Sequence, residues 1–270
     1  MSKILSIIAW KMPKLQSFQV IRFREPSPFE FYLPQGAGPF PLVCLTPILG
    51  RLAFLNDLFL ERRFARFYAA HGLATALIDR PIFEFNPGRG LEQIQEYLNE
   101  SVSRNRRVLD FLIAGQSVDR EKIVTYGASF GAVVNILWAA QDPRPKAHLF
   151  ALGGVNLAEI VLTSRDPLMK SYLKAIVKNT GLGPEELKVS LRKTFQPDLL
   201  EAARSIPKEK VCLHLAIFDR VIRFRYGLAL REALGRPETW FIPLGHYSAI
   251  LSIPFLKWQA LAFFRKRLGL

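Results

Sequence analysis

From residue 40 onward, apolar runs of strand length alternate with amphipathic runs of helix length. This alternation constrains the fold more than any other feature, because it is typical of a mostly parallel sheet with helices on both faces. Strand-like segments lie at residues 18–23, 29–33, 42–46, 73–78, 123–126, 148–152, 211–217 and 239–242, which predicts eight strands. Helix-like segments lie at about residues 52–70, 91–114, 132–138, 222–234 and 253–267. The first two strands flank Pro26-Ser27-Pro28 and are expected to form an antiparallel pair.

A tract over residues 155–207 interrupts this alternation, because it has helical periodicity but no clear strand. An insertion at this point would lie over the carboxyl ends of the strands, where α/β proteins bind ligands. We therefore expect a helical cap, with Met169 and Tyr172 as candidate substrate-binding residues. An extra packing layer remote from any site is the alternative. We find no internal repeat or linker, so one domain over residues 1–270 is expected.

The pentapeptide Gly127-Ala128-Ser129-Phe130-Gly131 follows the fifth strand and precedes a helix. A serine on so tight a turn takes a strained backbone conformation, and its hydroxyl stands clear of the sheet at the start of the helix. The glycines two residues on either side let the strand and the helix approach without a Cβ clash. This context predicts a nucleophile elbow built around Ser129. An ordinary glycine-rich turn is the alternative.

A serine nucleophile needs a base to take its proton, and a histidine base needs a carboxylate to fix its tautomer. His246 lies between the last strand and the last helix, where a catalytic base must project. His71 has the position of a helix cap, while His148 and His214 lie in apolar strand runs. Asp219 directly follows the seventh strand and is the expected acid, with a solvated surface aspartate as the alternative. Two aspartates inside the cap tract are weaker candidates: Asp166 and Asp198.

The predicted triad has the chain order Ser129, Asp219, His246, which is the order of α/β-hydrolases rather than of chymotrypsin-like or subtilisin-like proteases. On these residues the chain resembles the α/β-hydrolase superfamily, in the style of bacterial serine esterases with a helical cap. The resemblance covers residues 17–267 and implies an α/β-hydrolase fold that uses no metal and no organic cofactor. The elbow serine differs from the aspartate of dehalogenases and epoxide hydrolases and from the cysteine of dienelactone hydrolase.

Many members of this superfamily carry His-Gly after the third strand, followed by a backbone amide that completes the oxyanion hole. This chain has Thr46-Pro47-Ile48-Leu49-Gly50 instead. Proline has no N–H to donate, so Pro47 is excluded as the donor. We therefore expect the backbone amides of Phe130 and Ile48 to hold the developing oxyanion.

The net charge of +14 raises the question of nucleic-acid or anionic-lipid binding. The basic residues are scattered and none lies in a recognisable nucleic-acid motif, so we expect no nucleic-acid partner. Solvated helix faces are the preferred account of these residues, and attraction to an anionic lipid surface is the second.

The first eleven residues contain a short apolar core flanked by lysines and lack a small-residue cleavage site. This pattern predicts an amphipathic segment that packs on the protein or contacts a membrane peripherally. No apolar stretch approaches the roughly 18–20 residues that span a bilayer, and Cys44 and Cys212 lie in apolar runs typical of buried, reduced thiols. A cytoplasmic protein, peripheral at the membrane surface through its N-terminal segment, is therefore expected.

Together these features predict a serine hydrolase that cleaves a small-molecule carboxylic ester or thioester through an acyl-enzyme intermediate. The cap is expected to favour acyl or alcohol groups with an apolar portion. Two alternatives stay open: a non-catalytic binding or scaffold module with the same fold, and an acyltransferase that uses the same triad. The intact triad order argues against the first, and the second requires the same residues as hydrolysis.

Overall fold

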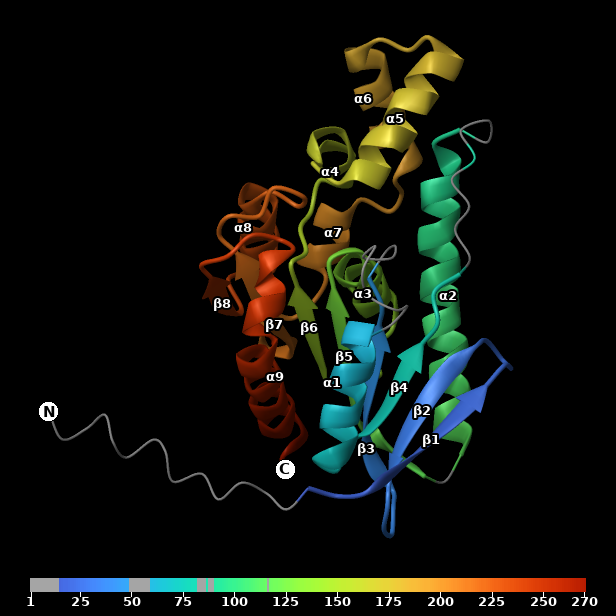
Figure 1. Ribbon diagram of the computed structural model, residues 1–270, viewed down its shortest axis with the longest axis vertical. Coiled ribbons are helices and arrows are strands. Elements are labelled where there is room, and N and C mark those ends of the chain that lie inside the picture. Colours follow the sequence, from blue (N-terminus) through green and yellow to red (C-terminus); the bar gives the residue numbers. More distant parts are fainter. Residues whose placement is uncertain (1–14, 49–58, 82–85, 87–89, 116) are drawn as a thin grey trace, which may run out of the picture.

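The computed structural model describes residues 15–48, 59–81, 86, 90–115 and 117–270. Within these residues, eight strands form a single sheet in the order β1-β2-β4-β3-β5-β6-β7-β8 (Figure 1). The strands are β1 (Phe18–Phe23), β2 (Phe29–Pro34), β3 (Phe40–Thr46), β4 (Ala74–Ile78), β5 (Val118–Ala128), β6 (Ala147–Ala151), β7 (Val211–Ala216) and β8 (Glu238–Ile242). β2 pairs antiparallel with both β1 and β4, and every other neighbouring pair is parallel. The predicted mostly parallel, eight-stranded sheet is thus confirmed.

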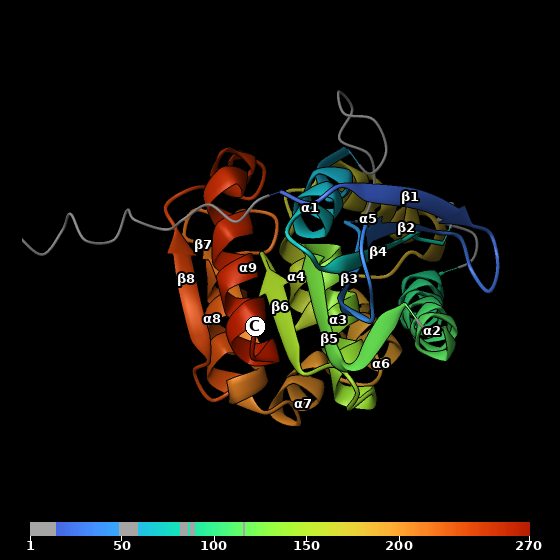
Figure 2. The ribbon, with the colours of Figure 1, turned by 90° about the horizontal axis from the view of Figure 1, so that it is seen from below.

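Helices cover both faces of the sheet, as Figure 2 shows in the view from below. They are α1 (Phe59–Ala70), α2 (Glu92–Ala114), α3 (Phe130–Gln141), α4 (Leu157–Thr163), α5 (Pro167–Thr180), α6 (Pro184–Thr194), α7 (Leu199–Arg204), α8 (Phe224–Ala233) and α9 (Ile253–Leu268), with short 3₁₀ turns η3 (Lys208–Lys210) and η4 (Ser248–Ser252). Side chains of α1 and α9 form one buried cluster with the sheet, and those of α2, α3 and α8 form another. Along β3, Leu42 and Cys44 belong to the α2–α3 cluster, whereas Val43 and Leu45 belong to the α1–α9 cluster. This alternation is the period of two that a strand covered on both faces requires.

β5 begins at Val118, five residues before the segment that the sequence pattern indicated. Residues Asp119 to Lys122 are all charged, so the sequence pattern does not indicate the beginning of this strand. Its pairing with β3 also shifts register there, since Phe40 pairs with Val118 and Leu42 pairs with Ile123. A polar, irregular start to a strand leaves no alternating signal in the sequence.

Helices α4, α5 and α6 lie beyond the arrowheads of the central strands β5 and β6 (Figure 1). Most of their apolar side chains do not form a separate core, and only Ile160 of α4 lies in a small cluster of its own, with Ile222 and Tyr226. Tyr172 and Ile176 of α5 and Leu187 and Leu191 of α6 are buried in the same cluster as the α2–α3 face of the sheet. These helices are therefore packed continuously onto the sheet at the end where the parallel strands terminate.

Two segments named in the sequence analysis lie outside the described residues: the amphipathic N-terminal segment and residues 52–58 of the first predicted helix. Both cysteines are free and buried, Cys44 on β3 and Cys212 on β7. No helix in the described ranges has the length and apolar character needed to cross a membrane.

Candidate active site

Ser129 lies between the last residue of β5 and the first residue of α3. Its backbone has φ 54° and ψ −121°, a conformation that a residue with a side chain rarely adopts. The Ser129 amide donates to the carbonyl of Ala151 on β6 at 2.8 Å, and the Ser129 carbonyl accepts from the Ala132 amide at 3.0 Å. These bonds to a strand and a helix hold the strained turn and aim the Ser129 hydroxyl away from the sheet.

Both flanking glycines are required by close backbone contacts. A Cβ at Gly127 would collide with the backbone carbonyl of Gly131 and would approach Asn135 Nδ2 to 2.8 Å. A Cβ at Gly131 would collide with the Thr46 carbonyl, so the first turn of α3 rests directly on the end of β3. The turn thus brings Ser129 next to the segment that follows β3.

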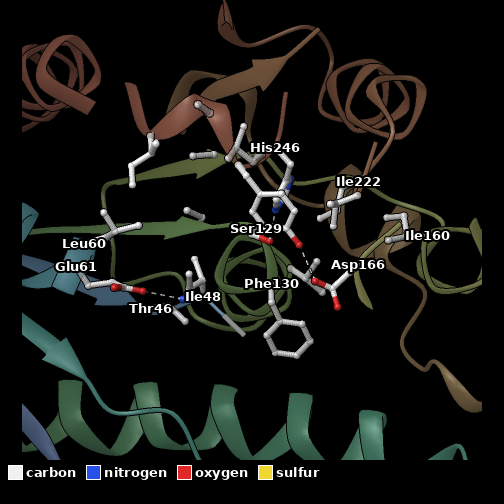
Figure 3. A pocket seen from close by; sticks show the side chains of 18 of the residues that line it. Thr46, Ile48, Leu60, Glu61, Ser129, Phe130, Ile160, Asp166, Ile222 and His246 are labelled. Carbon is white, nitrogen blue, oxygen red and sulfur yellow. Dashed lines mark hydrogen bonds between the residues drawn. The ribbon is translucent and has the colours of Figure 1, made fainter. Parts of the chain in front are cut away.

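The structure brings the three residues of the predicted triad together (Figure 3). His246 Nε2 lies 2.8 Å from Ser129 Oγ, and His246 Nδ1 lies 2.6 Å from Asp219 Oδ2. The side chains of His246 and Asp219 are 9% and 3% exposed, so their contact is shielded from solvent. The second oxygen of Asp219 accepts the amides of Val221 (2.8 Å) and Ile222 (2.9 Å), which fixes the carboxylate in the turn after β7.

The other histidines lie elsewhere in the described structure. His71 directly follows α1, and its Nδ1 lies 2.6 Å from the Phe67 carbonyl. His148 on β6 and His214 on β7 are 2% and 0% exposed, and burial lowers the pKa of each to about 3. Neither buried ring can take up a proton near neutral pH, whereas His246 borders a cavity.

The two weaker acid candidates have structural contacts instead. Asp198 accepts from the Leu200 amide at the start of α7. Asp166 accepts from the Met169 amide at the start of α5 through Oδ1, and from the Tyr247 hydroxyl (2.7 Å) through Oδ2. This second bond joins the start of α5 to the residue next to His246, and burial together with this bond raises the pKa of Tyr247.

A cavity of about 550 Å³ opens beside Ser129 and His246. Most of the described side chains around it are apolar, among them Phe64, Val133, Leu157, Ile160, Ile222 and Ile250. They come from both helical layers and from the α4 region, so the cavity lies between the sheet and the helices beyond it. Such a site can hold the apolar part of a small molecule while its reacting group faces the serine.

Of the two candidate substrate-binding residues, Met169 lines this cavity and Tyr172 does not. Tyr172 is 3% exposed and belongs to the core cluster, and its hydroxyl donates to the Gly90 carbonyl. The helical periodicity of α5 places both residues on one apolar face. In the structure, part of this face lines the cavity through Met169 and part is buried in the core through Tyr172.

The two candidate oxyanion amides differ in their surroundings. The Phe130 amide opens α3, where the first amides of a helix have no intrahelical acceptor. The Phe130 ring packs on Tyr97 of α2, with ring centroids 5.4 Å apart. The Ile48 amide donates to Glu61 Oε1 on α1 at 3.1 Å, so this amide already has an acceptor (Figure 3).

A buried polar cluster, not expected from the sequence, supports the end of β3. Thr46 Oγ1 donates to Asn135 Oδ1 on α3 at 2.7 Å and accepts from Asn105 Nδ2 on α2 at 2.8 Å. All three side chains are buried. Asparagines inside apolar helical runs were the available signal, but their shared partner lies 59 and 89 residues away. Among the described residues, no group of three or more histidine, cysteine, aspartate or glutamate side chains could hold a metal ion.

No protein-family model matches the chain. Two curated relatives are named Esterase FrsA. The one from Escherichia fergusonii is 30% identical over 169 residues, and the one from Citrobacter koseri is 29% identical over 167 residues. Each alignment covers 60% of this chain, and the chain spans 38% of the length of either relative.

Solved structures resemble this chain over almost its whole length. An acetyl xylan esterase from Paenibacillus sp. R4 has a TM-score of 0.65 at 17% identity, covering 93% of this chain and 89% of the esterase. The α/β hydrolase GrgF from Penicillium sp. sh18 has a TM-score of 0.62 at 13% identity, covering 94% and 100%. A puromycin-hydrolyzing peptidase from Mycobacterium tuberculosis has a TM-score of 0.66 at 16% identity, covering 94% and 40%. The chain therefore has the α/β-hydrolase fold.

Proposed function

We propose that this protein is a serine hydrolase that cleaves a carboxylic ester or thioester of a small molecule. The observation that carries the proposal is the continuous hydrogen-bonded array from Ser129 Oγ through His246 to Asp219, at 2.8 and 2.6 Å. Its serine sits on a strained strand-to-helix turn beside a cavity of about 550 Å³. The names of the relatives from E. fergusonii and C. koseri, both esterases, support the same class of reaction.

In the proposed reaction, His246 Nε2 takes the proton of the Ser129 hydroxyl while Oγ attacks the substrate carbonyl carbon. Asp219 Oδ2 accepts a hydrogen bond from the Nδ1–H of His246 and stabilises the imidazolium that forms. The imidazolium then gives its proton to the departing alcohol or thiol, which leaves an acyl-serine. Water, deprotonated by the same histidine, then attacks the acyl carbon. As the bond from this carbon to Ser129 Oγ breaks, the imidazolium returns its proton to Oγ, which releases the acid and restores the free serine.

The oxyanion that forms in each step needs donors that face the carbonyl oxygen. We assign this role to the amides of Phe130, at the start of α3, and Ile48, after β3. The contact between Gly131 and the end of β3 supports this pairing, because it holds the two segments side by side. Removal of one such donor typically costs about 2.7–4 kcal/mol of transition-state stabilisation.

We also propose that residues 155–207 act as a cap within a single domain. Leu157, Ile160 and Met169 from this tract line the cavity, so it contributes to the walls above the serine. The hydrogen bond between Tyr247 and Asp166 ties the tract to the loop of the catalytic histidine. A cap of this composition would exclude water and favour apolar acyl or alcohol groups.

The decisive experiment is Ser129→Ala, measured by hydrolysis of p-nitrophenyl esters and by labelling with a fluorophosphonate probe. The wild-type protein should hydrolyse the esters and be labelled at Ser129. The variant should lose both properties and keep its melting temperature, because the alanine Cβ occupies the same turn. Full hydrolytic activity in a folded Ser129→Ala protein would refute the proposal.

A further inference from the structure

The cavity differs in charge from the rest of the protein. The chain has 37 lysines and arginines against 23 aspartates and glutamates. Yet the described residues around the cavity include no lysine or arginine, while two of them, Glu61 and Asp166, are acidic. Figure 3 shows these two carboxylates on opposite sides of Ser129. An apolar cavity whose charged walls are acidic favours a cation over an anion inside it.

The two carboxylates are not equally available to a bound molecule. Asp166 uses one oxygen for the Met169 amide and the other for the Tyr247 hydroxyl. Glu61, in the first turn of α1, accepts a single hydrogen bond among the described residues, from the Ile48 amide to Oε1. A carboxylate can accept several hydrogen bonds. Glu61 Oε2 accepts none from the described residues and can bind a donor of a bound molecule, whereas both oxygens of Asp166 already accept one.

Among the described residues, the half-buried Glu61 also lacks the arginine partners that the buried Glu30 has. Glu30, on β2, is held by Arg62 at 2.8 Å and by Arg22 at 3.2 Å. Within the described ranges, Glu61 makes no ion pair with lysine or arginine. The negative charge of Glu61 nonetheless acts on a buried neighbour. The pKa of Tyr126 is raised first by burial and second by the coulombic effect of Glu61.

This position creates a conflict with the proposed reaction, on which the inference rests. Glu61 places a negative charge at the amide that we assign to the oxyanion hole, where the transition state develops a second negative charge. Like charges at short range in a low-dielectric cavity repel strongly. A positively charged substrate group next to Glu61 would remove this repulsion and would draw the carboxylate away from the Ile48 amide.

We propose that Glu61 is a specificity-determining residue that selects substrates with a cationic group, such as an ammonium, on an apolar body. Pairing of the substrate cation with the Glu61 carboxylate neutralises the charge beside the oxyanion. The same pairing frees the Ile48 amide for the substrate carbonyl oxygen. Recognition of the cation and completion of the oxyanion hole are thereby coupled.

The test uses substrate pairs of equal shape that differ only in charge. With the cation on the acyl side, the pair is p-nitrophenyl 6-aminohexanoate and p-nitrophenyl heptanoate. With the cation on the leaving group, the pair is butyrylthiocholine and its uncharged 3,3-dimethylbutyl analogue. In at least one pair, the wild-type protein should prefer the cationic member by about tenfold or more in kcat/KM, because the ion pair forms in a low-dielectric site.

The variant Glu61→Gln keeps an oxygen that can accept from the Ile48 amide but removes the charge. It should bring the two members of the preferred pair close to equal kcat/KM, and it should raise the rate on the neutral member. Glu209→Gln is the matched control, since Glu209 is an exposed acidic residue of η3 that does not line the cavity. This control should keep the wild-type preference.

A wild-type preference for the neutral member in both pairs would overturn the inference, as would a cationic preference that Glu61→Gln leaves unchanged. These results are separable from failure of the proposed function. A protein that fluorophosphonate labels at Ser129, and that hydrolyses neutral esters without favouring cations, refutes only the role of Glu61. A protein that is neither labelled nor active on any of the four substrates refutes the serine-hydrolase proposal as well.

Discussion

At the scale of single residues, the two carboxylate oxygens of Asp219 make separate sets of hydrogen bonds. One carboxylate oxygen contacts His246 Nδ1, and the other accepts the amides of Val221 and Ile222. Replacement by alanine would therefore disturb the turn as well as the histidine. Replacement by asparagine separates the two sets, because its Oδ1 can still accept the two amides.

We expect the Asp219→Asn variant to fold normally and to have a kcat about 10⁴-fold lower than wild type. The same change in a serine-protease triad lowers kcat by this factor. The asparagine Nδ2 donates a hydrogen bond to His246 Nδ1, so the imidazole carries its proton on Nε2. In this tautomer Nε2 cannot accept the proton of the Ser129 hydroxyl. The measurement is steady-state kinetics on p-nitrophenyl butyrate, with the melting temperature as a check on folding.

Asp198→Asn is the control, because Asp198 caps α7 and asparagine is an equally good helix cap. This variant should keep wild-type kcat. If Asp219→Asn remained close to wild type in kcat, the acid role would pass to another carboxylate.

At the scale of elements, helix α5 is divided between two environments. Met169, in its first turn, borders the cavity, while Tyr172, one turn later, is buried and bonded to the Gly90 carbonyl. If residues 155–207 form the proposed cap, the dependence of kcat/KM on substrate chain length should be set by Met169 and not by Tyr172.

Met169→Ala should alter the dependence of kcat/KM on acyl length, measured with p-nitrophenyl esters from acetate to octanoate. Each methylene that contacts the cap contributes about 0.8 kcal/mol when fully buried, so the wild-type values should rise with length and the variant should flatten that rise. Tyr172→Phe should lower the melting temperature and leave the profile unchanged. A flat wild-type profile, unaffected by Met169→Ala, would exclude α5 as a selectivity element.

The sequence predicted the elements whose signals are local. The elbow at Ser129 and the alternation of strands and helices are patterns of a few neighbouring residues, and the mostly parallel sheet was found as expected. His246 and Asp219 were proposed because each directly follows a strand, and parallel strands end at one edge of a sheet.

The features that the sequence did not predict depend on pairs far apart in the chain. Tyr247 and Asp166 are separated by 81 residues, and Thr46 and Asn135 by 89. No periodicity relates such residues, so only the fold brings them into contact. The contact of Glu61 with the Ile48 amide is of the same kind, since it needs α1 to pack beside the end of β3.

At the scale of the whole molecule, the central strands carry two neutral histidines inside the core. Thr125 Oγ1 lies 3.0 Å from His148 Nδ1, so this ring has a hydrogen-bond partner. Neither ring nitrogen of His214 hydrogen-bonds to another described residue. Burial lowers both pKa values from 6.5 to about 3. An unfolded chain would protonate these rings near pH 6.5, so both link the stability of the sheet to pH.

The sign of this linkage follows from proton counting. Between pH 6.5 and 3 the unfolded state binds protons at His148 and His214 that the folded state excludes, so stability falls as the pH falls. Each ring should contribute a slope of up to about 1.4 kcal/mol per pH unit once the pH is below 6.5. Denaturant unfolding from pH 7.5 to 5 measures this slope above the range in which most carboxylates titrate.

The variant His214→Leu removes one titrating ring and two buried nitrogens without hydrogen bonds. It should therefore be at least as stable as wild type at pH 7.5 and lose less stability on acidification. An equal slope in the two proteins would mean that His214 is protonated in the folded state or is not buried as described.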